Sequence, residues 1–207
     1  QVIDLAMDAV YDCKRATAPT ALGEDHVRAF ERIGLAIAEA IQLKGLMDVE
    51  VILHKGELKV LEIDARLPSQ TPTAVYWSSG INMVKLLGEL FTRRALCANP
   101  DPHPRAVIYE HIRVSRDGVE SAGEHIMSRV GPLHIRRRFF GADEAITNYH
   151  PGRLEWVATL IFSGSSIEAL AARRTHTIHQ IREQAGRVGG IGPVSENMGL
   201  PSRGVCG

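Results

Sequence analysis

Apolar residues recur at helical spacing between Glu24 and about Leu43. Five of them lie three or four positions apart: Val27, Phe30, Ile33, Ile37 and Ile41. Acidic residues open this stretch and Gly45 follows it, as is typical of the two ends of a helix. The same spacing predicts helices from about Gly80 to Arg94 and from about Ser165 to Arg187.

Other stretches alternate between apolar and polar residues, which predicts β-strands. Residues 47–64 contain two alternating runs on either side of Lys55-Gly56, which is typical of a hairpin. Further strands are expected within 1–15 (a strand or a strand plus turn), 106–114, 123–140 and 153–164. Residues 16–23 and 65–79 are expected to be loops, since prolines and glycine interrupt them.

This order of elements predicts an α+β fold in two parts. The segment 97–105, with three prolines, is the best candidate for a linker between residues 1–96 and a smaller, mostly antiparallel domain at 106–187. The glycine-rich residues 188–207 are expected to form a flexible tail. The sequence starts at Gln1, already inside an alternating stretch, which indicates that native sequence precedes it.

Composition narrows the class of protein. The chain has 207 residues, with 24 Lys plus Arg and 24 Asp plus Glu, so no net charge favours nucleic acid or an anionic membrane. Its three cysteines form no C-x-x-C pair, which argues against a disulfide framework and indicates a reducing, cytoplasmic location. No apolar run approaches the ~20 residues that span a bilayer.

In the expected hairpin, many apolar residues occupy odd sequence positions and the acidic residues near its ends occupy even ones. Five odd positions are apolar (Val49, Val51, Leu53, Leu61 and Ile63), whereas the even positions include Asp48, Glu50, Glu62 and Asp64. A two-residue turn would place Glu50 and Glu62 on opposite faces, whereas a three-residue loop ending at Gly56 would place all even positions together. The apolar residues favour the three-residue loop, because the other arrangement would expose half of the core face.

Carboxylates this close together repel one another unless a cation compensates them. Mg²⁺ accepts carboxylate oxygens and leaves room for phosphate oxygens. The alternative is a polar sheet face that is satisfied by Arg66, Lys59 and solvent. Four acidic residues on one face, next to Arg66 and a loop bounded by prolines, favour metal and phosphate chemistry.

The segment "DVEVILHKGELKVLEIDAR" resembles the carboxylate hairpin of ATP-grasp carboxylate–amine ligases. The resemblance implies ATP and Mg²⁺ as cofactors, with Glu50 as the first metal ligand, Glu62 as a bridging ligand and Asp64 as the third. Asp64 replaces the Asn of many members but keeps an oxygen ligand. Arg66 matches a basic residue near phosphate or the substrate carboxylate, where it would steady the transferred phosphoryl group.

Four further segments resemble the ATP-grasp ligase family of pyrrolysine biosynthesis: "YDCKRATAP", "LEIDARLPSQTPTAVYWSSGINMVKLLGELF", "VIYEHI" and "FFGADEAITNY". This resemblance extends from about Asp4 to Ile161. It implies a ligase that joins (3R)-3-methyl-D-ornithine to the ε-amine of L-lysine. It also implies that an N-terminal α/β domain and a nucleotide-clamping subdomain, both part of that family, are missing from this sequence.

Two short segments near the hairpin have alternative roles. Ser69, Gln70 and Thr71 either bind the amino-acid substrate or form a plain connector between prolines. Lys14 and Arg15 lie either along the triphosphate or substrate carboxylate, or at a solvated strand end.

Three alternatives remain for the protein as a whole. It is the pyrrolysine-type ligase, another ATP-grasp amino-acid ligase, or a non-catalytic module that binds metal or small molecules. The expected partners are amino-acid substrates and the missing N-terminal portion, with a homodimer as a further possibility.

Overall fold

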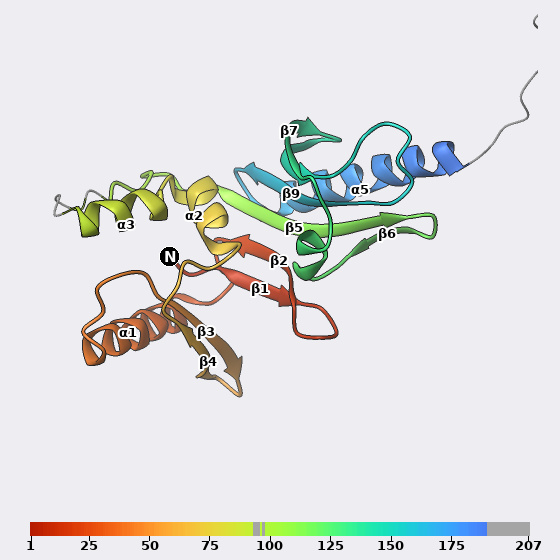
Figure 1. The fold of residues 1–207 in the computed structure, drawn as a ribbon. Coiled ribbons are helices and arrows are strands. Elements are labelled where there is room, and N and C mark those ends of the chain that lie inside the picture. The colour runs from red at the N-terminus through yellow and green to blue at the C-terminus, as the bar shows by residue number, and fades with distance from the viewer. Residues whose placement is uncertain (93–95, 97, 190–207) are drawn as a thin grey trace, which may run out of the picture.

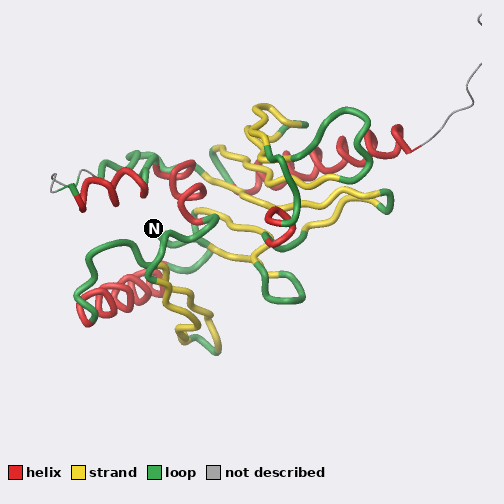
Figure 2. The backbone as a smooth tube through the Cα atoms, viewed as in Figure 1, coloured by secondary structure: helices red, strands yellow, loops and turns green. Residues whose placement is uncertain are grey.

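A computed structural model describes residues 1–92, 96 and 98–189, and its largest element is a seven-stranded antiparallel sheet (Figures 1 and 2). Strand order is β1-β2-β5-β9-β8-β7, and β6 pairs with β5. The strands are β1 (Asp4–Met7), β2 (Cys13–Ala18), β5 (Ala106–Ser115), β6 (Gly118–Ser121), β7 (His134–Phe139), β8 (Ala142–Thr147) and β9 (Trp156–Gly164). The α+β class predicted from the sequence is confirmed.

Helices cover both faces of this sheet. Helix α5 (Ile167–Gly189) lies along one face, where its apolar residues pack on β5 and β9 around Ile112, Leu160 and Phe162. Helix α2 (Thr71–Ser79) covers part of the other face, over Tyr109 and Ile161. The short helix α4 (His125–Ser128) contacts β9. Because strand residues alternate in direction, even positions of β5 face α5 and odd positions face α2.

A smaller region lies to one side of the sheet (Figure 1). It contains the two-stranded hairpin β3 (Asp48–His54) and β4 (Glu57–Asp64), with α1 (Glu24–Ala40) in contact with β4. Helix α3 (Met83–Phe91) follows α2. Neither α1 nor α3 contains a buried residue.

The predicted helices and the hairpin are confirmed, and three other expectations are wrong. The expected loop 65–79 contains α2, because Pro72 occupies the first turn of a helix, where a missing N–H breaks no hydrogen bond. The expected strand at 123–140 contains α4 as well as β7, and the expected connector 16–23 begins with the last residues of β2. Strand β8 was not expected.

The predicted linker 97–105 separates strands that belong to one sheet. Strand β2 precedes it and β5 follows it, yet the two pair, with Arg15 opposite Glu110. Two N–H groups within it, at Asp101 and Arg105, donate to carbonyls of α2 at 2.7 and 2.8 Å. The division into domains at this segment stays a prediction, and the predicted tail lies outside the described residues from position 190 onward. No described helix has the length and apolarity to cross a membrane.

Candidate active site at the carboxylate hairpin

The hairpin turn consists of two residues, so the predicted three-residue loop is wrong. His54 lies opposite Glu57, which leaves only Lys55 and Gly56 in the turn. Their φ angles of 50° and 81° are both left-handed, as a type I′ turn requires. Glycine adopts this conformation without steric cost, which explains why Gly56 follows Lys55.

A β-bulge restores the arrangement that the turn alone would prevent. Val51 lies opposite Val60, but the residue before it in β3, Glu50, lies opposite Glu62. Leu61 therefore has no partner in β3 and is an extra residue in β4. Beyond the bulge Asp48 lies opposite Asp64. Opposed residues share a face of the hairpin, so these four carboxylates project from one side.

Electrostatics shows that this face is short of positive charge. Burial raises the pKa of the half-buried Glu50, and the charges of Asp48, Glu62 and Asp64 raise it further. Burial likewise raises the pKa of Asp48, while Arg66 opposes that shift. Arg66 Nη2 lies 2.5 Å from Asp64 Oδ2, and its side chain is 60% exposed. Clustered carboxylate oxygens with one exposed counter-ion fit a hard divalent cation.

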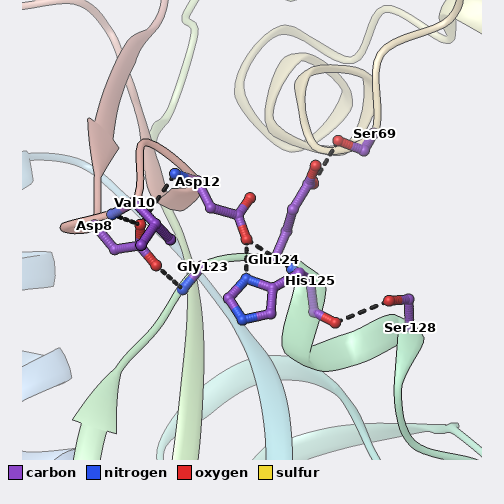
Figure 3. Close-up of polar contacts among 8 residues, drawn as sticks. All are labelled: Asp8, Val10, Asp12, Ser69, Gly123, Glu124, His125 and Ser128. Carbon is purple, nitrogen blue, oxygen red and sulfur yellow. Dashed lines mark hydrogen bonds and ion pairs between the residues drawn. The ribbon is translucent and has the colours of Figure 1, made fainter.

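The tightest grouping of possible metal ligands lies elsewhere. Within the described residues, ligand atoms of Asp8, Asp12 and His125 all lie within 4.8 Å of one another (Figure 3). The hairpin carboxylates do not form such a group. The metal-ligand roles of Glu50, Glu62 and Asp64 therefore stay predictions.

The apolar side of the hairpin is exposed, so its prediction as a core face is wrong. Leu61 is 63% exposed and Ile63 48%. A cavity of about 380 Å³ lies next to the hairpin and is lined by Asp48, Glu50 and Thr71 together with apolar residues such as Phe30.

The loop before α2 connects this cavity to a second one. Thr71 lines the hairpin cavity, Gln70 is buried, and Ser69 lines the second cavity together with Glu124. Ser69 Oγ donates to Glu124 Oε2 at 2.5 Å (Figure 3). The predicted substrate loop is thus held in place by side-chain contacts, although the structure does not test its role.

Lys14 and Arg15 do not form ion pairs with the hairpin carboxylates. Arg15 lies opposite Glu110, on the face of the sheet that α5 covers. Lys14 is the extra residue of a bulge, since Ala6 pairs with Arg15 but Met7 pairs with Cys13. Their roles in binding phosphate or substrate stay predictions.

Sequence reasoning missed the acidic residues around Cys13. Burial raises the pKa of the Cys13 thiol to about 12, and the charges of Glu124, Glu50 and Asp12 add to that shift. These carboxylates come from three distant parts of the chain, so no sequence spacing could reveal them.

Two solved structures have a similar fold. Phosphoribosylglycinamide synthetase from Anaerococcus prevotii is similar with a TM-score of 0.59 at 12% identity, over 86% of this chain and 46% of that one. An N5-carboxyaminoimidazole ribonucleotide synthetase in complex with ADP is similar with a TM-score of 0.55 at 11% identity, over 87% and 45%. The α+β fold of this chain is therefore similar to somewhat less than half of each of these two proteins.

Two curated proteins are similar to the chain in sequence. The chain is 35% identical over 190 residues to the 3-methyl-D-ornithine–L-lysine ligase of Methanosarcina barkeri, covering 88% of this chain and 48% of the relative. It is 43% identical over 123 residues to the ligase of that name from Methanosarcina mazei, covering 59% and 32%. The chain thus spans about half the length or less of these relatives. No family model matches it.

Proposed function

We propose that this chain forms the carboxylate-bearing part of an ATP-dependent ligase that joins two amino acids through an amide bond, with 3-methyl-D-ornithine and L-lysine as the substrates. One observation carries the proposal. The bulge at Leu61 places Glu50 opposite Glu62 and Asp48 opposite Asp64, on a face whose negative charge has one exposed counter-ion. The names of the similar Methanosarcina enzymes support the choice of substrates.

The reaction has two steps. A substrate carboxylate oxygen attacks the γ-phosphorus of ATP, and the bond to ADP breaks, which gives an acylphosphate. The nitrogen of the second substrate then attacks the acyl carbon, phosphate leaves, and the amine loses a proton. Bound Mg²⁺ would neutralise the charge on the phosphate oxygens during the first step.

The residues of this chain have three roles in that scheme. Glu50, Glu62 and Asp64 hold the cations through carboxylate oxygens. Arg66, exposed next to Asp64, offers its remaining N–H groups to phosphoryl oxygens, a geometry to which a guanidinium is suited. The loop that begins at Ser69 binds the amino-acid substrate on the side of the second cavity.

The adenine pocket and the nucleotide-clamping subdomain would lie in an upstream portion of the enzyme. That portion is also the proposed partner of the exposed apolar side of the hairpin. A cytoplasmic location and a homodimer remain predictions.

The test is Glu62→Gln in a full-length enzyme that contains this chain. We expect the turnover of ATP with both amino acids to fall at least about 100-fold, since a metal ion supplies several kcal/mol of charge stabilisation. The free energy of unfolding should change little, because Glu62 is exposed.

Glu57→Gln provides the matched control. Glu57 is an exposed glutamate of the same strand, at the hairpin tip, where it contacts Lys59. We expect wild-type turnover in that variant. Wild-type turnover in Glu62→Gln at ordinary Mg²⁺ concentration would contradict the metal assignment and favour a non-catalytic binding module.

A further inference from the structure

A third cavity, of about 290 Å³, lies beside α4 at the end of β5 and the start of β9. Its strand residues are paired neighbours, since Arg113 lies opposite Val157 and Val114 opposite Trp156. None of the described residues that line it also lines the second cavity or the hairpin cavity. An engineered protein cavity of about 150 Å³ binds benzene, so the third cavity has room for a small organic molecule.

Asn148, which directly follows β8, is a buried residue that lines this cavity. It is 3% exposed, and its Oδ1 accepts a hydrogen bond from the Val157 N–H at 2.9 Å. Because that N–H can only donate, the orientation of the amide is fixed and Nδ2 carries both N–H donors. Nδ2 is buried and has no hydrogen-bond partner within residues 1–92, 96 and 98–189. Most buried polar groups are paired, so Asn148 indicates an acceptor that binds from outside.

Two guanidinium groups at the cavity have no carboxylate partner in the described part of the chain. Arg129, exposed just after α4, forms no ion pair or side-chain hydrogen bond with a described residue. Arg153 donates to two backbone carbonyls at 2.8 and 3.2 Å, which hold the side chain in place and leave Nη2 without a described partner. Arg113 is already paired with Glu120. Since Glu155 is the one acidic residue among the described lining residues, the cavity has an excess of positive charge.

Part of the lining is apolar and fixed by packing. Trp156 is 5% exposed and Ile126 3%. The indole of Trp156 packs on the rings of Phe139 and Tyr149, with centroids 5.7 and 4.9 Å away. These contacts order the apolar wall before a ligand binds, which lowers the entropic cost of binding.

From these contacts we propose that the third cavity binds a small organic oxyanion, that is, a carboxylate or phosphate attached to an apolar group. Asn148 Nδ2 donates to one oxygen of the anion, and Arg129 and Arg153 supply charge-assisted hydrogen bonds. Trp156 and Ile126 cover the apolar group. The inference goes beyond the proposed ligase function, since no residue of the carboxylate hairpin or of the loop at Ser69 lines this cavity.

The experiment uses the 207-residue chain. Benzoate, phenyl phosphate and benzyl alcohol are titrated separately while NMR follows the side-chain amide of Asn148 and the indole N–H of Trp156. All three ligands have a phenyl ring, and only benzyl alcohol lacks an anionic group. We expect at least one of the two anions to shift the Asn148 amide, and benzyl alcohol to leave it in place at the same concentration. The anion that binds more tightly identifies which oxyanion the cavity prefers.

Two variants locate the groups that bind the anion. Asn148→Asp keeps the acceptor for the Val157 N–H but replaces both donors with a negative charge. Arg129→Gln removes one guanidinium from an exposed position, where folding is not at risk. Each should weaken binding of the anion about tenfold or more, because each removes a hydrogen bond to a charged group. Thermal unfolding shows whether Asn148→Asp, which buries a charge, remains folded.

Arg32→Gln is the matched control. Arg32 is an exposed arginine of α1 that does not line the cavity, and its loss changes the net charge by the same amount as Arg129→Gln. This variant should bind the anion as the wild type does. Three outcomes would overturn the assignment: no shift of the Asn148 amide by either anion, an equal shift by benzyl alcohol, or wild-type binding of the anion by Arg129→Gln.

Discussion

The sheet under α5 and the hairpin beside α1 differ in how much of each is buried. All of β5 is buried except Arg113 and Ser115, and all of β9 except Gly164. In the hairpin no residue of β3 or β4 is buried. Even a charged group is accommodated inside the sheet region, where Glu110, 1% exposed, pairs with Arg174 of α5.

The part of the chain that stabilises the fold therefore differs from the part that carries the proposed metal ligands. The buried strands supply the apolar area that stabilises the fold. The hairpin supplies a charged face, and its strands contain no buried residue. Regions with few buried apolar contacts open most easily. The second cavity has its floor on the buried strands, where Tyr109, His111 and Thr159 line it.

One substitution made in both regions tests this contrast most strongly. Leu160→Ala should lower the free energy of unfolding by about 2–5 kcal/mol, because Leu160 is fully buried and its loss leaves a cavity. Leu61→Ala, at a side chain 63% exposed, should change it by less than about 0.5 kcal/mol. Urea denaturation followed by circular dichroism measures both. Equal losses would show that the hairpin shares the core.

A pH titration tests the floor of the second cavity. The pKa of His111 is about 4 in the folded chain and about 6.5 when unfolded, so below pH 6.5 the unfolded state binds more protons. The stability from His111 is therefore complete above pH 6.5 and is lost as the pH falls toward 4, by up to about 1.4 kcal/mol per pH unit. His111→Phe should flatten the stability curve in that window. An unchanged slope would contradict the buried, neutral state of His111.

Gly56→Ala tests whether the hairpin opens independently of the sheet. Gly56 has a φ of 81°, where alanine costs about 1 kcal/mol. Amide hydrogen exchange in β3 and β4 should quicken about fivefold, while exchange in β5 and β9 stays at the wild-type rate. Faster exchange in all four strands would mean that they unfold as one unit.

The smallest expected signal comes from nucleotide binding by the isolated chain. If the adenine pocket lies in an upstream portion, calorimetry of the 207-residue chain with Mg-ATP should give little heat. Mg²⁺ alone should bind weakly, since the carboxylates would leave the cation largely hydrated. Tight, stoichiometric ATP binding would place the nucleotide site within this chain.

Sequence patterns predicted most helices and strands but not the tertiary contacts between them. Strand β5 was predictable because it opens with four consecutive apolar residues and is rich in β-branched ones, and α1 because its apolar residues keep helical spacing. Helix α2 was missed because Pro72 interrupts a helical pattern in general but is tolerated in the first turn. The second cavity was not predictable, since Asp12, Ser69, His111 and Glu124 meet only after the sheet has formed.

The carboxylate face was predicted correctly for the wrong reason. Parity showed that Glu50 and Glu62 share a side only if one strand gains a residue relative to the other. The sequence did not reveal whether that residue lies in the turn or in β4, because both solutions have the same length. The structure places it at Leu61.

The bulge at Leu61 makes the acidic end of the hairpin tolerant of changes in length. Leu61 is the unpaired extra residue of β4, so a chain without it would still pair Glu50 with Glu62, in a regular ladder. A residue added to the turn would lengthen the loop and leave the strand pairs unchanged. Related chains can thus differ at the tip of this hairpin, or in whether they have the bulge, while Glu50 stays opposite Glu62 and Asp48 opposite Asp64.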